Sequence, residues 1–584
     1  MSSLIVSSFV IPSHSRMRTD IHGFQKHSLS TKRSATTAVT TNAPIVRRSA
    51  NYAPSRWSYD HIQSLTSNYV DNEHKDDFDN MKEEVRKIIS KECAVEKPLI
   101  TLQLVDDLQR LGISYHFKDE ICSMLKMIYD CYYEGHENWN KLDLNLKALG
   151  FRLLRQHGYP IPQEIFEDLW DETRNIKAHV LEDVEGMLSL YEASFLGVEN
   201  ESILDEAREL TIKCLEEKLE KNINDNESLS MFISHALELP LHWRPQRFEA
   251  VWFIDAYKGK SDMKPLLLEF AKLDYNILQG IHQQDLKYTS RWCNDLGWVK
   301  KLEFTRDRLV ESFMWGVAGN YEPDFCLVRR HLTKMVYFAN CIDDLYDTYG
   351  TVDELEQFTD VVTRWDINAA EGLPDYMKIF FIGLYNTINE MAYDSLTNQK
   401  PFTLPNVKKV VTQYCEADML EARWFYSGYT PTLEGYLNNA WITTGIPAIY
   451  LTTYFFSSSE ITPEVLENVV YLNSMIVRLS NDLQTSSAEA KRGHVPTSIQ
   501  CYMNKTGASE EKAKAYVKGL IVETWKKLNQ ERMVVHSPSS RIFIEYATDV
   551  ARNAQFTYAR GDQLGAPDDL YKSHQSAILF NPKS

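Results

Sequence analysis

A five-residue acidic stretch, Asp343-Asp344-Leu345-Tyr346-Asp347, follows an apolar run at 335–342. On a helix, residues four apart lie within about 40° of each other around the axis, so Asp343 and Asp347 share a face and Asp344 lies at its margin. Grouped carboxylates repel unless they bind a cation, and ligands that are all oxygen favour Mg²⁺ or Mn²⁺. A solvated acidic surface is the alternative, because acidic clusters also occur at 76–79, 106–107 and 568–569.

A second polar pattern lies more than a hundred residues later. Asn481, Thr485 and Glu489 are spaced at i, i+4 and i+8, so one helix presents an amide, a hydroxyl and a carboxylate in a row. These are oxygen donors of the kind that a divalent ion takes. Arg478 lies one turn earlier on the same face. A row of metal ligands beside a guanidinium suits a diphosphate.

Together these motifs carry a family resemblance. An aspartate-rich DDxxD motif followed by (N/D)Dxx(S/T)xxxE resembles the class I terpene synthases. Arg47-Arg48, followed after eight residues by Trp57, is similar to the RRx8W motif of plant monoterpene synthases. The similarity extends along nearly all of the chain after the first ~45 residues, the kind of segment that targeting leaders occupy.

The resemblance implies an all-α fold with two helical domains. Residues 47–265 are expected to form an N-terminal α-barrel-like domain, and residues 266–584 a C-terminal class I terpenoid synthase α-bundle that binds the metal. The sequence supports this expected fold. Residues 57–264 show the apolar spacing of amphipathic helices, for example at 81–89, 102–111 and 203–221, and no alternating strand pattern. The first domain lacks the DxDD motif of protonation-initiated cyclases, which predicts a structural role for it.

The resemblance also implies a reaction. Geranyl diphosphate would be ionised with three Mg²⁺ or Mn²⁺ ions, isomerised through linalyl diphosphate and converted to a monoterpene with release of diphosphate, which makes the chain a carbon–oxygen lyase. The implied metal-binding residues come from both motifs: Asp343, Asp344, Asp347, Asn481, Asp482, Thr485 and Glu489.

The family pattern assigns further residues to the substrate. Arg306, Arg308 and Arg478 would bind the diphosphate, beside Asp343, Asp347 and Asn481. Trp315, Tyr571 and His574 would lie near the carbocation, and Arg47 and Arg48 would close an N-terminal strand over the pocket during isomerisation. Without the family pattern, Arg308 reads as a surface arginine in an ion pair, and Trp315, Tyr571 and His574 read as ordinary packing.

Two departures from the family pattern bear on chemistry. A diphosphate-contacting lysine that commonly follows Val-Pro is replaced by Thr497, with His494 three residues earlier. Several cyclases that add water carry a polar residue seven positions before the first metal aspartate, where this chain has Val336. Asn340, one turn later, either replaces that residue or makes a packing contact.

Composition restricts the class of partner. A net charge of −18 argues against nucleic acid and anionic membrane surfaces, and the longest uncharged run, 435–459, reads as a kinked buried helix rather than a membrane span. The nine cysteines form no CxxC pair. Residues 1–46 are rich in Ser and Thr with one acid, Asp20, which is typical of a plastid transit peptide. The plastid stroma is therefore the predicted location, with a monomer or a homodimer as the working form.

Other functions stay open at this point. A sesquiterpene synthase acting on farnesyl diphosphate and a synthase of acyclic products such as linalool or myrcene fit the same motifs. A prenyl diphosphate synthase would carry a second DDxxD, which this chain lacks. A non-enzymatic helical scaffold is the most distant alternative.

Overall fold

The computed structural model describes residues 47–48, 52–69, 74–94, 96–134, 139, 141–173, 176–221, 227–398, 402, 404–450, 463–492, 496–534 and 538–584. The predicted transit segment 1–46 and His494 lie outside these ranges. Within them the structure is helical, apart from an isolated bridge between Trp170 and Ile176, and the predicted all-α fold is confirmed.

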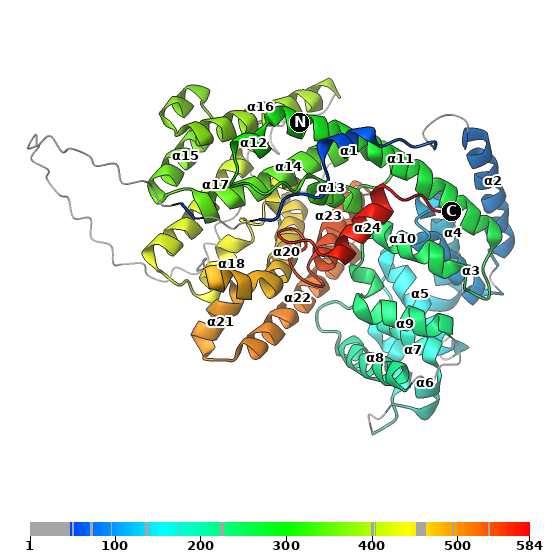
Figure 1. Cartoon of the computed structure of the whole chain (residues 1–584). Coiled ribbons are helices and arrows are strands. Elements are labelled where there is room, and N and C mark those ends of the chain that lie inside the picture. Colours follow the sequence, from blue (N-terminus) through cyan, green and yellow to red (C-terminus); the bar gives the residue numbers. More distant parts are fainter. Residues whose placement is uncertain are drawn as a thin grey trace, which may run out of the picture.

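The helices form two groups that lie side by side (Figure 1). The first group comprises α1 (Tyr59–Ser64), α2 (Lys75–Glu92), α3 (Pro98–Arg110), α4 (Lys118–Ile128), α5 (Leu144–Gln156), α6 (Ala178–Glu182), α7 (Val184–Ser194), α8 (Ser202–Glu220), α9 (Glu227–Glu238) and α10 (Gln246–Tyr257). The second comprises α11 (Pro265–Leu296), α12 (Trp298–Lys301), α13 (Leu309–Gly319), α14 (Cys326–Asp344), α15 (Val352–Arg364), α16 (Asp375–Thr397), α17 (Leu404–Ser427), α18 (Leu433–Ala440), α20 (Pro463–Arg492), α21 (Ser498–Thr506), α22 (Glu510–Met533), α23 (Pro538–Thr557) and α24 (Asp569–Leu579).

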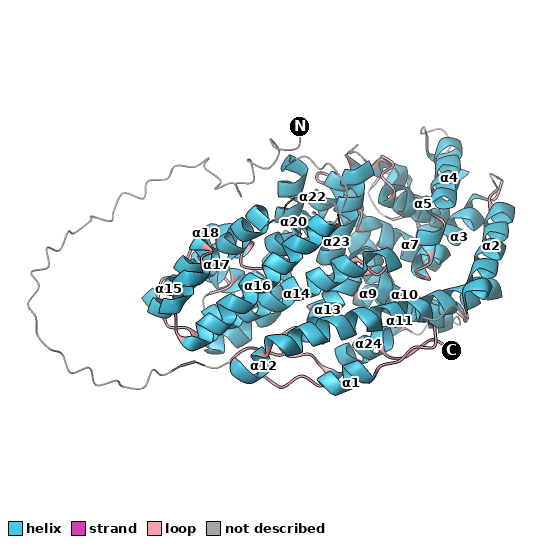
Figure 2. Ribbon diagram, turned by 90° about the horizontal axis from the view of Figure 1, so that it is seen from above, coloured by secondary structure: helices cyan, strands magenta, loops and turns pink. Residues whose placement is uncertain are grey.

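Each group buries its own apolar core. One core runs from Val85 to Tyr275 and is centred on α3, α5 and α7, and a second runs from Cys293 to Tyr558 around α14, α17 and α20. The 32-residue helix α11 spans both groups (Figure 2), because its first turns pack in the first core and its last turns against the second. The division at 265/266 remains a prediction, although α11 does begin at Pro265, where proline is tolerated in the first turn.

Local sequence fixes several helix ends that position the site. Thr351 and Glu354 form a reciprocal capping box at the start of α15. Gly297 ends α11 at φ +67°, a left-handed conformation that glycine adopts without steric cost. The helix α14 continues into a π-helical turn, η9 (Leu345–Tyr349), so the acidic stretch lies where the regular helix widens. Such π-turns occur frequently at functional sites.

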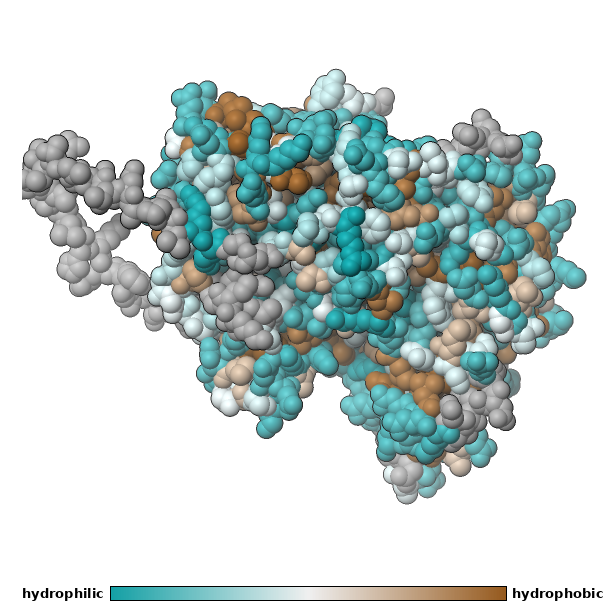
Figure 3. Space-filling model, in the orientation of Figure 1, coloured by the Kyte–Doolittle hydropathy of each residue, from teal (hydrophilic) through white to brown (hydrophobic). Residues whose placement is uncertain are grey.

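The face seen in Figure 3 is mostly polar, with small scattered apolar patches. No helix in the described part of the chain is both long and apolar enough to cross a membrane. The uncharged run that begins at Gly435 contains a helix break, because α18 ends at Ala440 and Gly445 takes φ +71°.

Candidate active site

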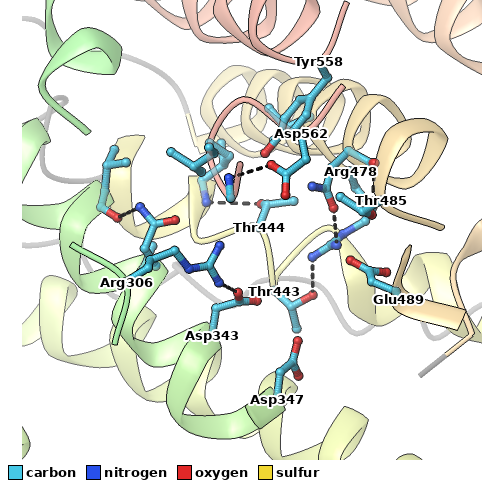
Figure 4. A pocket seen from close by; sticks show the side chains of 18 of the residues that line it. Arg306, Asp343, Asp347, Thr443, Thr444, Arg478, Thr485, Glu489, Tyr558 and Asp562 are labelled. Atoms are coloured by element: carbon cyan, nitrogen blue, oxygen red, sulfur yellow. Dashed lines mark hydrogen bonds and ion pairs between the residues drawn. The ribbon is translucent and has the colours of Figure 1, made fainter. Parts of the chain in front are cut away.

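A cavity of about 410 Å³ opens between α14, α17 and α20 in the second helical group (Figure 4). The structure brings eight of the predicted site residues to its wall: Arg306, Trp315, Asp343, Asp347, Arg478, Asn481, Thr485 and Glu489. They come from segments up to 183 positions apart in the chain, so only the fold assembles them.

The first set of oxygen donors belongs to α14 and η9. Asp343 is the penultimate residue of α14 and Asp347 lies in the π-turn that follows, and both carboxylates point into the cavity (Figure 4). Burial raises the pKa of Asp347 well above its usual range, and the negative charges of Asp343, Glu421 and Glu489 raise it further. Among the described residues, no lysine or arginine forms an ion pair with Asp347.

The second set lies across the cavity on α20. Asn481, Thr485 and Glu489 line the wall as the spacing predicts, with Thr485 and Glu489 visible opposite the aspartates in Figure 4. Burial raises the pKa of Glu489 to about 7, and the charge of Asp482 adds to this. Two buried carboxylates with raised pKa values on facing helices indicate that the site is poised for positive charge.

Two guanidinium groups lie between the acids. Arg306 forms ion pairs with Asp343 and with Asp344, the latter at 2.7 Å. Arg478 donates from Nη2 to Thr443 Oγ1 at 2.9 Å and from Nε to the carbonyl of Ala440 at 3.0 Å. Both arginines are therefore held in place at the cavity wall by fixed partners.

The excess of carboxylates among the described residues of the cavity wall suits the binding of divalent cations. Six carboxylate side chains but only two arginines line it, the acids being Asp343, Asp347, Asp418, Glu421, Glu489 and Asp562. Oδ2 of Asp418 is buried without a hydrogen-bond partner in the described part of the chain. Because uncompensated buried carboxylates are unfavourable, hard cations bound by these oxygens would relieve the repulsion. The donor set holds no histidine or cysteine, which favours Mg²⁺ or Mn²⁺ over Zn²⁺.

Apolar side chains line part of the remaining wall. They include Trp315, Val336, Ala339, Ile446, Ile449 and Val477. Asn340 lies on α14 with Val336 and Ala339, and its amide donates to the carbonyl of Val336 at 2.9 Å, which fixes it against its own helix. A site with an acidic rim and an apolar wall can hold an anion–cation complex while shielding a hydrocarbon chain from water.

Known proteins share this arrangement. A family profile described as "Terpene synthase, N-terminal domain" matches residues 56–237, and one described as "Terpene synthase family, metal binding domain" matches residues 294–527. The chain is 48% identical over 560 residues to a chloroplastic R-linalool synthase of Artemisia annua. The aligned region covers 94% of this chain and 97% of that protein. This chain belongs to the terpene synthase family.

Solved structures of the family superpose closely on this terpene synthase. A limonene synthase with 2-fluorolinalyl diphosphate matches with a TM-score of 0.88 and 39% identity, covering 92% of this chain and 100% of that one. An isoprene synthase from grey poplar, in complex with three Mg²⁺ ions and dimethylallyl-S-thiolodiphosphate, matches with a TM-score of 0.82 and 42% identity over 91% and 99% of the two chains. The predicted family, fold and enzyme class are therefore confirmed.

Asp344 and Asp482, unlike the other predicted metal ligands, do not line the cavity, so their metal-binding role stays a prediction. The carboxylate of Asp344 is fully buried and accepts from the backbone N–H of Arg306 at 2.8 Å and from its Nε at 2.9 Å. That of Asp482 accepts from the hydroxyl of Tyr436 and the N–H of Ser498, each at 3.0 Å. Adjacent helical residues lie about 100° apart, so each faces away from its metal-facing neighbour. Both position an active-site segment.

Arg308 also lies outside the cavity, contrary to its predicted contact with substrate. Its guanidinium donates to the carbonyls of Leu564 at 3.1 Å, Gly565 at 2.9 Å and Ala53 at 3.0 Å. These three residues line the cavity themselves. Arg308 therefore holds the C-terminal loop and the N-terminal strand against the site, and it is neither a surface arginine nor a direct ligand.

Tyr571 and His574 occupy a different place from the one predicted. Both lie on or near α24 and line a small depression of about 30 Å³ with Glu238 and Arg560, apart from the active-site cavity. The ring of His574 is tilted against that of Phe556, with ring centroids 5.3 Å apart. The structure places neither side chain at the active-site cavity, so their role near the carbocation stays a prediction.

Two polar side chains from the C-terminal part of the chain also line the cavity, those of Tyr558 and Asp562 in the loop after α23 (Figure 4). Their sequence, in a loop without periodicity, carries no spacing signal. Asp418 and Glu421 on α17 were also missed, although three residues apart they share a helix face. Burial raises the pKa of Asp418 well above its usual range, with the charges of Glu421 and Asp347 adding to the effect.

The N-terminal strand reaches the site from outside. Arg47 binds Glu354 at the start of α15, and the guanidinium of Arg48 lies 4.0 Å from the ring centroid of Phe425. Neither arginine lines the cavity, whereas Tyr52 and Ala53 do. Trp57 anchors the far end, since its indole packs 4.7 Å from the ring of Phe580. The described parts of this segment are thus held by Arg47 at one end and by Trp57 at the other.

Thr497 lines the cavity at the position where a lysine is common in the family. Its backbone N–H donates to Oε1 of Gln500 at 2.9 Å in a capping box that starts α21. The side chain is buried and neutral, so the diphosphate end of the site has one cation fewer than a lysine would give it.

Proposed function

We propose that this terpene synthase is a monoterpene synthase that ionises geranyl diphosphate. The observation that carries the proposal is the facing pair of oxygen-donor sets, Asp343 and Asp347 on one side and Asn481, Thr485 and Glu489 on the other, above an apolar wall. The R-linalool synthase and the limonene synthase that resemble this chain are named for ten-carbon compounds, and the isoprene synthase for a five-carbon compound. A cavity of about 410 Å³ lies in the range of small-ligand pockets.

Three Mg²⁺ ions, as in the isoprene synthase complex, would be held by these five residues. Bound metal supplies electrostatic stabilisation of the charge that develops on the leaving diphosphate. Arg306 and Arg478 donate hydrogen bonds to the diphosphate oxygens, since a guanidinium can contact two phosphate oxygens at once. The ion pair between Arg306 and Asp344 keeps that guanidinium in place before substrate enters.

The allylic cation that remains needs a dry and electron-rich wall. Trp315 is 4% exposed, and its ring face stabilises a nearby cation by an amount on the order of 1–2 kcal/mol when desolvated. Val336, Ile446 and Val477 offer no lone pair to a water molecule, which delays capture of the cation. The strand fixed by Arg47 closes the entrance and keeps the diphosphate near the cation.

Cyclic products require one further step. The trans double bond of geranyl diphosphate prevents direct ring closure, so the diphosphate must return to the tertiary carbon to give linalyl diphosphate before rotation and cyclisation. Capture of water at the linalyl cation gives linalool, and loss of a proton after cyclisation gives limonene. The contours of the wall determine which of these routes predominates.

Targeting to the plastid stroma completes the proposal. The Ser/Thr-rich composition of residues 1–46 supports it, as does the chloroplastic location in the name of the Artemisia annua relative. A fluorescent protein fused after residue 46 should accumulate in plastids, and a cytosolic signal would contradict this part.

The activity is tested by incubating the chain from Arg47 onward with geranyl, farnesyl or dimethylallyl diphosphate and analysing volatile products. Ten-carbon products with Mg²⁺, and none with a chelator, are expected. A higher kcat/KM with farnesyl diphosphate would make the protein a sesquiterpene synthase. No turnover of any allylic diphosphate would leave the non-enzymatic scaffold as the better account.

A further inference from the structure

A second and larger cavity, of about 490 Å³, lies between the two helical groups and away from the active site. Its walls come from α3, α4, α5 and α10 on one side and from α22 and α23 on the other. In Figure 1 these last two helices face the first group. Nothing in the proposed reaction uses this cleft.

The charge of the cleft is opposite to that of the protein as a whole. Seven lysine or arginine side chains and five carboxylates line it, whereas the chain carries a net charge of −18. Four of the arginines are each hydrogen-bonded to an acid in the wall: Arg110 to Glu249, Arg152 to Asp106, Arg532 to Glu545, and Arg552 to Asp549. Lys118 and Glu322 form an exposed pair at 3.1 Å that joins the two groups. Arg244 shares Glu249 with Arg110, at 3.4 Å, so the excess positive charge rests with these two arginines and with Arg541.

The guanidinium of Arg532 has a hydrogen-bond donor in the cleft without an acceptor among the described residues. Its side chain is 6% exposed, and it donates from Nε and Nη2 to Oε1 of Glu545 at 3.1 and 2.6 Å. Nη1 is buried without a hydrogen-bond partner among the described residues. A buried guanidinium N–H left without an acceptor is unfavourable, so an anion from solvent would be stabilised there.

Arg541 adds a whole guanidinium without an acid. It lies on the exposed side of α23, and no carboxylate in the described part of the chain forms an ion pair with it. Gly158 lies beside it, because a Cβ built at Gly158 would be in ordinary van der Waals contact with the Arg541 guanidinium carbon, at 4.0 Å. The same Cβ would lie 3.9 Å from the carbonyl oxygen of Arg532, so Gly158, Arg532 and Arg541 share one corner of the cleft.

Gln156 completes this corner with an unpaired acceptor. Its backbone carbonyl accepts from Arg532 Nη2 at 3.4 Å, while its side-chain Oε1 is buried without a partner among the described residues. His157, the next residue, adds no charge, since burial lowers its pKa to about 4. A ligand that fits both Arg532 and Gln156 carries negative oxygens and at least one O–H donor.

We propose that the corner formed by Gln156, Arg532 and Arg541 is a metal-independent binding site for a phosphate-type anion, placed between the two helical groups. Hydrogen phosphate has the required chemistry, because its oxygens accept from guanidinium groups and its hydroxyl donates to an amide oxygen. Diphosphate, the proposed leaving group, has the same chemistry. An anion there contacts α5 on one side and α22 and α23 on the other, so its binding stabilises the docked arrangement of the groups.

Equilibrium dialysis of the full chain with radiolabelled phosphate, and separately diphosphate, tests the site. The buffer contains EDTA and about 0.15 M salt, which screens weak surface binding and leaves the acidic active-site cavity without metal. We expect one saturable site per chain. Arg541→Glu should weaken it at least tenfold, whereas Lys505→Glu, an equal charge change at an exposed position of α21, should change affinity less than twofold.

Two further variants separate the outcomes. Arg532→Gln should also abolish saturable binding, and Arg541→Glu decides the matter if the Arg532 variant does not fold. Arg478→Gln in the active-site cavity should leave the metal-free binding unchanged. Absence of saturable binding, equal losses in the Arg541 and Lys505 variants, or loss of binding in Arg478→Gln would each overturn the proposal. Tighter binding of phosphate or of diphosphate would identify which of the two anions the site prefers.

Discussion

Arg47 and Glu354 form a two-bonded ion pair, with Nη1 at 2.9 Å from Oε2 and Nη2 at 2.8 Å from Oε1. Glu354 also accepts from the backbone N–H of Thr351 at 3.1 Å, so one carboxylate caps α15 and holds the N-terminal strand. The hydroxyl of Tyr376 donates to the same carboxylate at 2.9 Å. The pair is 22% and 13% exposed, which shields it partly from water. It holds this end of the N-terminal segment against the start of α15.

Replacing Arg47 with Ala should therefore weaken closure rather than ionisation. We expect cyclic product from geranyl diphosphate to fall roughly tenfold in kcat/KM, about 1.4 kcal/mol, with a much smaller loss from supplied linalyl diphosphate. Glu354→Gln should give the same pattern, and the double variant should be little worse than either alone. Removal of residues 1–46 is the control and should preserve activity. Equal losses with both substrates would mean that the pair serves stability in general.

Replacing Asp347 with Asn removes a charge that the described residues leave uncompensated. Turnover of geranyl diphosphate should fall at least about 100-fold, because a proposed metal ligand is lost. The melting temperature in EDTA should stay the same or rise, because repulsion from Asp343, Glu421 and Glu489 is relieved. Asp353→Asn, at an exposed position of α15, is the control. A fall in melting temperature as large as that caused by truncating a buried core side chain would show that Asp347 contributes mainly to stability.

Val336 should disfavour capture of water by a cyclic cation. Asn340 cannot readily compensate, because its amide donates to the carbonyl of Val336 and approaches Ser312 Oγ at 3.5 Å. Hydrocarbons, or linalool captured early, should exceed 1,8-cineole in the product mixture, and Val336→Ser should raise the fraction of cyclic alcohols and ethers. Product analysis by gas chromatography decides this, with Val477→Ala as an apolar control at the same wall. Dominant cineole from the unchanged protein would contradict it.

Glu192 gives the first helical group a pH-dependent stability. Burial raises its pKa to about 7, despite the opposing charges of Arg152 and Arg110 and a hydrogen bond from the N–H of Leu241 at 2.8 Å. Because the folded pKa lies above the unfolded value, its favourable contribution is complete at low pH and is lost as pH rises through about 7.

Glu192→Gln keeps a side-chain oxygen that can accept from the N–H of Leu241, and it removes the ionisable carboxyl group. Calorimetry should show a gain in stability at pH 8, about 3 kcal/mol at most, and little change at pH 5. Glu216→Gln, at an exposed position of α8, reports the effect of the substitution alone. A gain at pH 5 as large as that at pH 8 would refute the titration of Glu192 as its cause.

Helical spacing accounts for what the sequence could predict of this site. Asn481, Thr485 and Glu489 had to share a face once 463–492 was helical, and the same holds for Asp343 and Asp347 across one turn. The neighbours Asp344 and Asp482 show the limit, because a motif groups residues that a helix separates by about 100°. Their partners, Arg306, Tyr436 and Ser498, are distant in sequence and appear only in the folded chain.

Loops account for most of what was missed. Tyr558 and Asp562 reach the cavity because Arg308 holds the following loop through the carbonyls of Leu564 and Gly565. No periodicity links Arg308 to a loop more than 250 positions later. The family pattern assigned the C-terminal aromatic and histidine to Tyr571 and His574, which lie on α24 beside a separate depression.

The central claim is that α14 and α20 bind divalent ions between them, and anomalous diffraction from crystals grown with Mn²⁺ and a non-hydrolysable geranyl diphosphate analogue tests it most directly. The account predicts anomalous peaks within about 2.5 Å of Asp343 and Asp347 oxygens and of Asn481, Thr485 and Glu489 oxygens, with the diphosphate between them. Crystals of the Asp347→Asn variant should lose the peaks on the α14 side. A diphosphate bound by arginines alone, with no anomalous peak at either helix, would contradict the account.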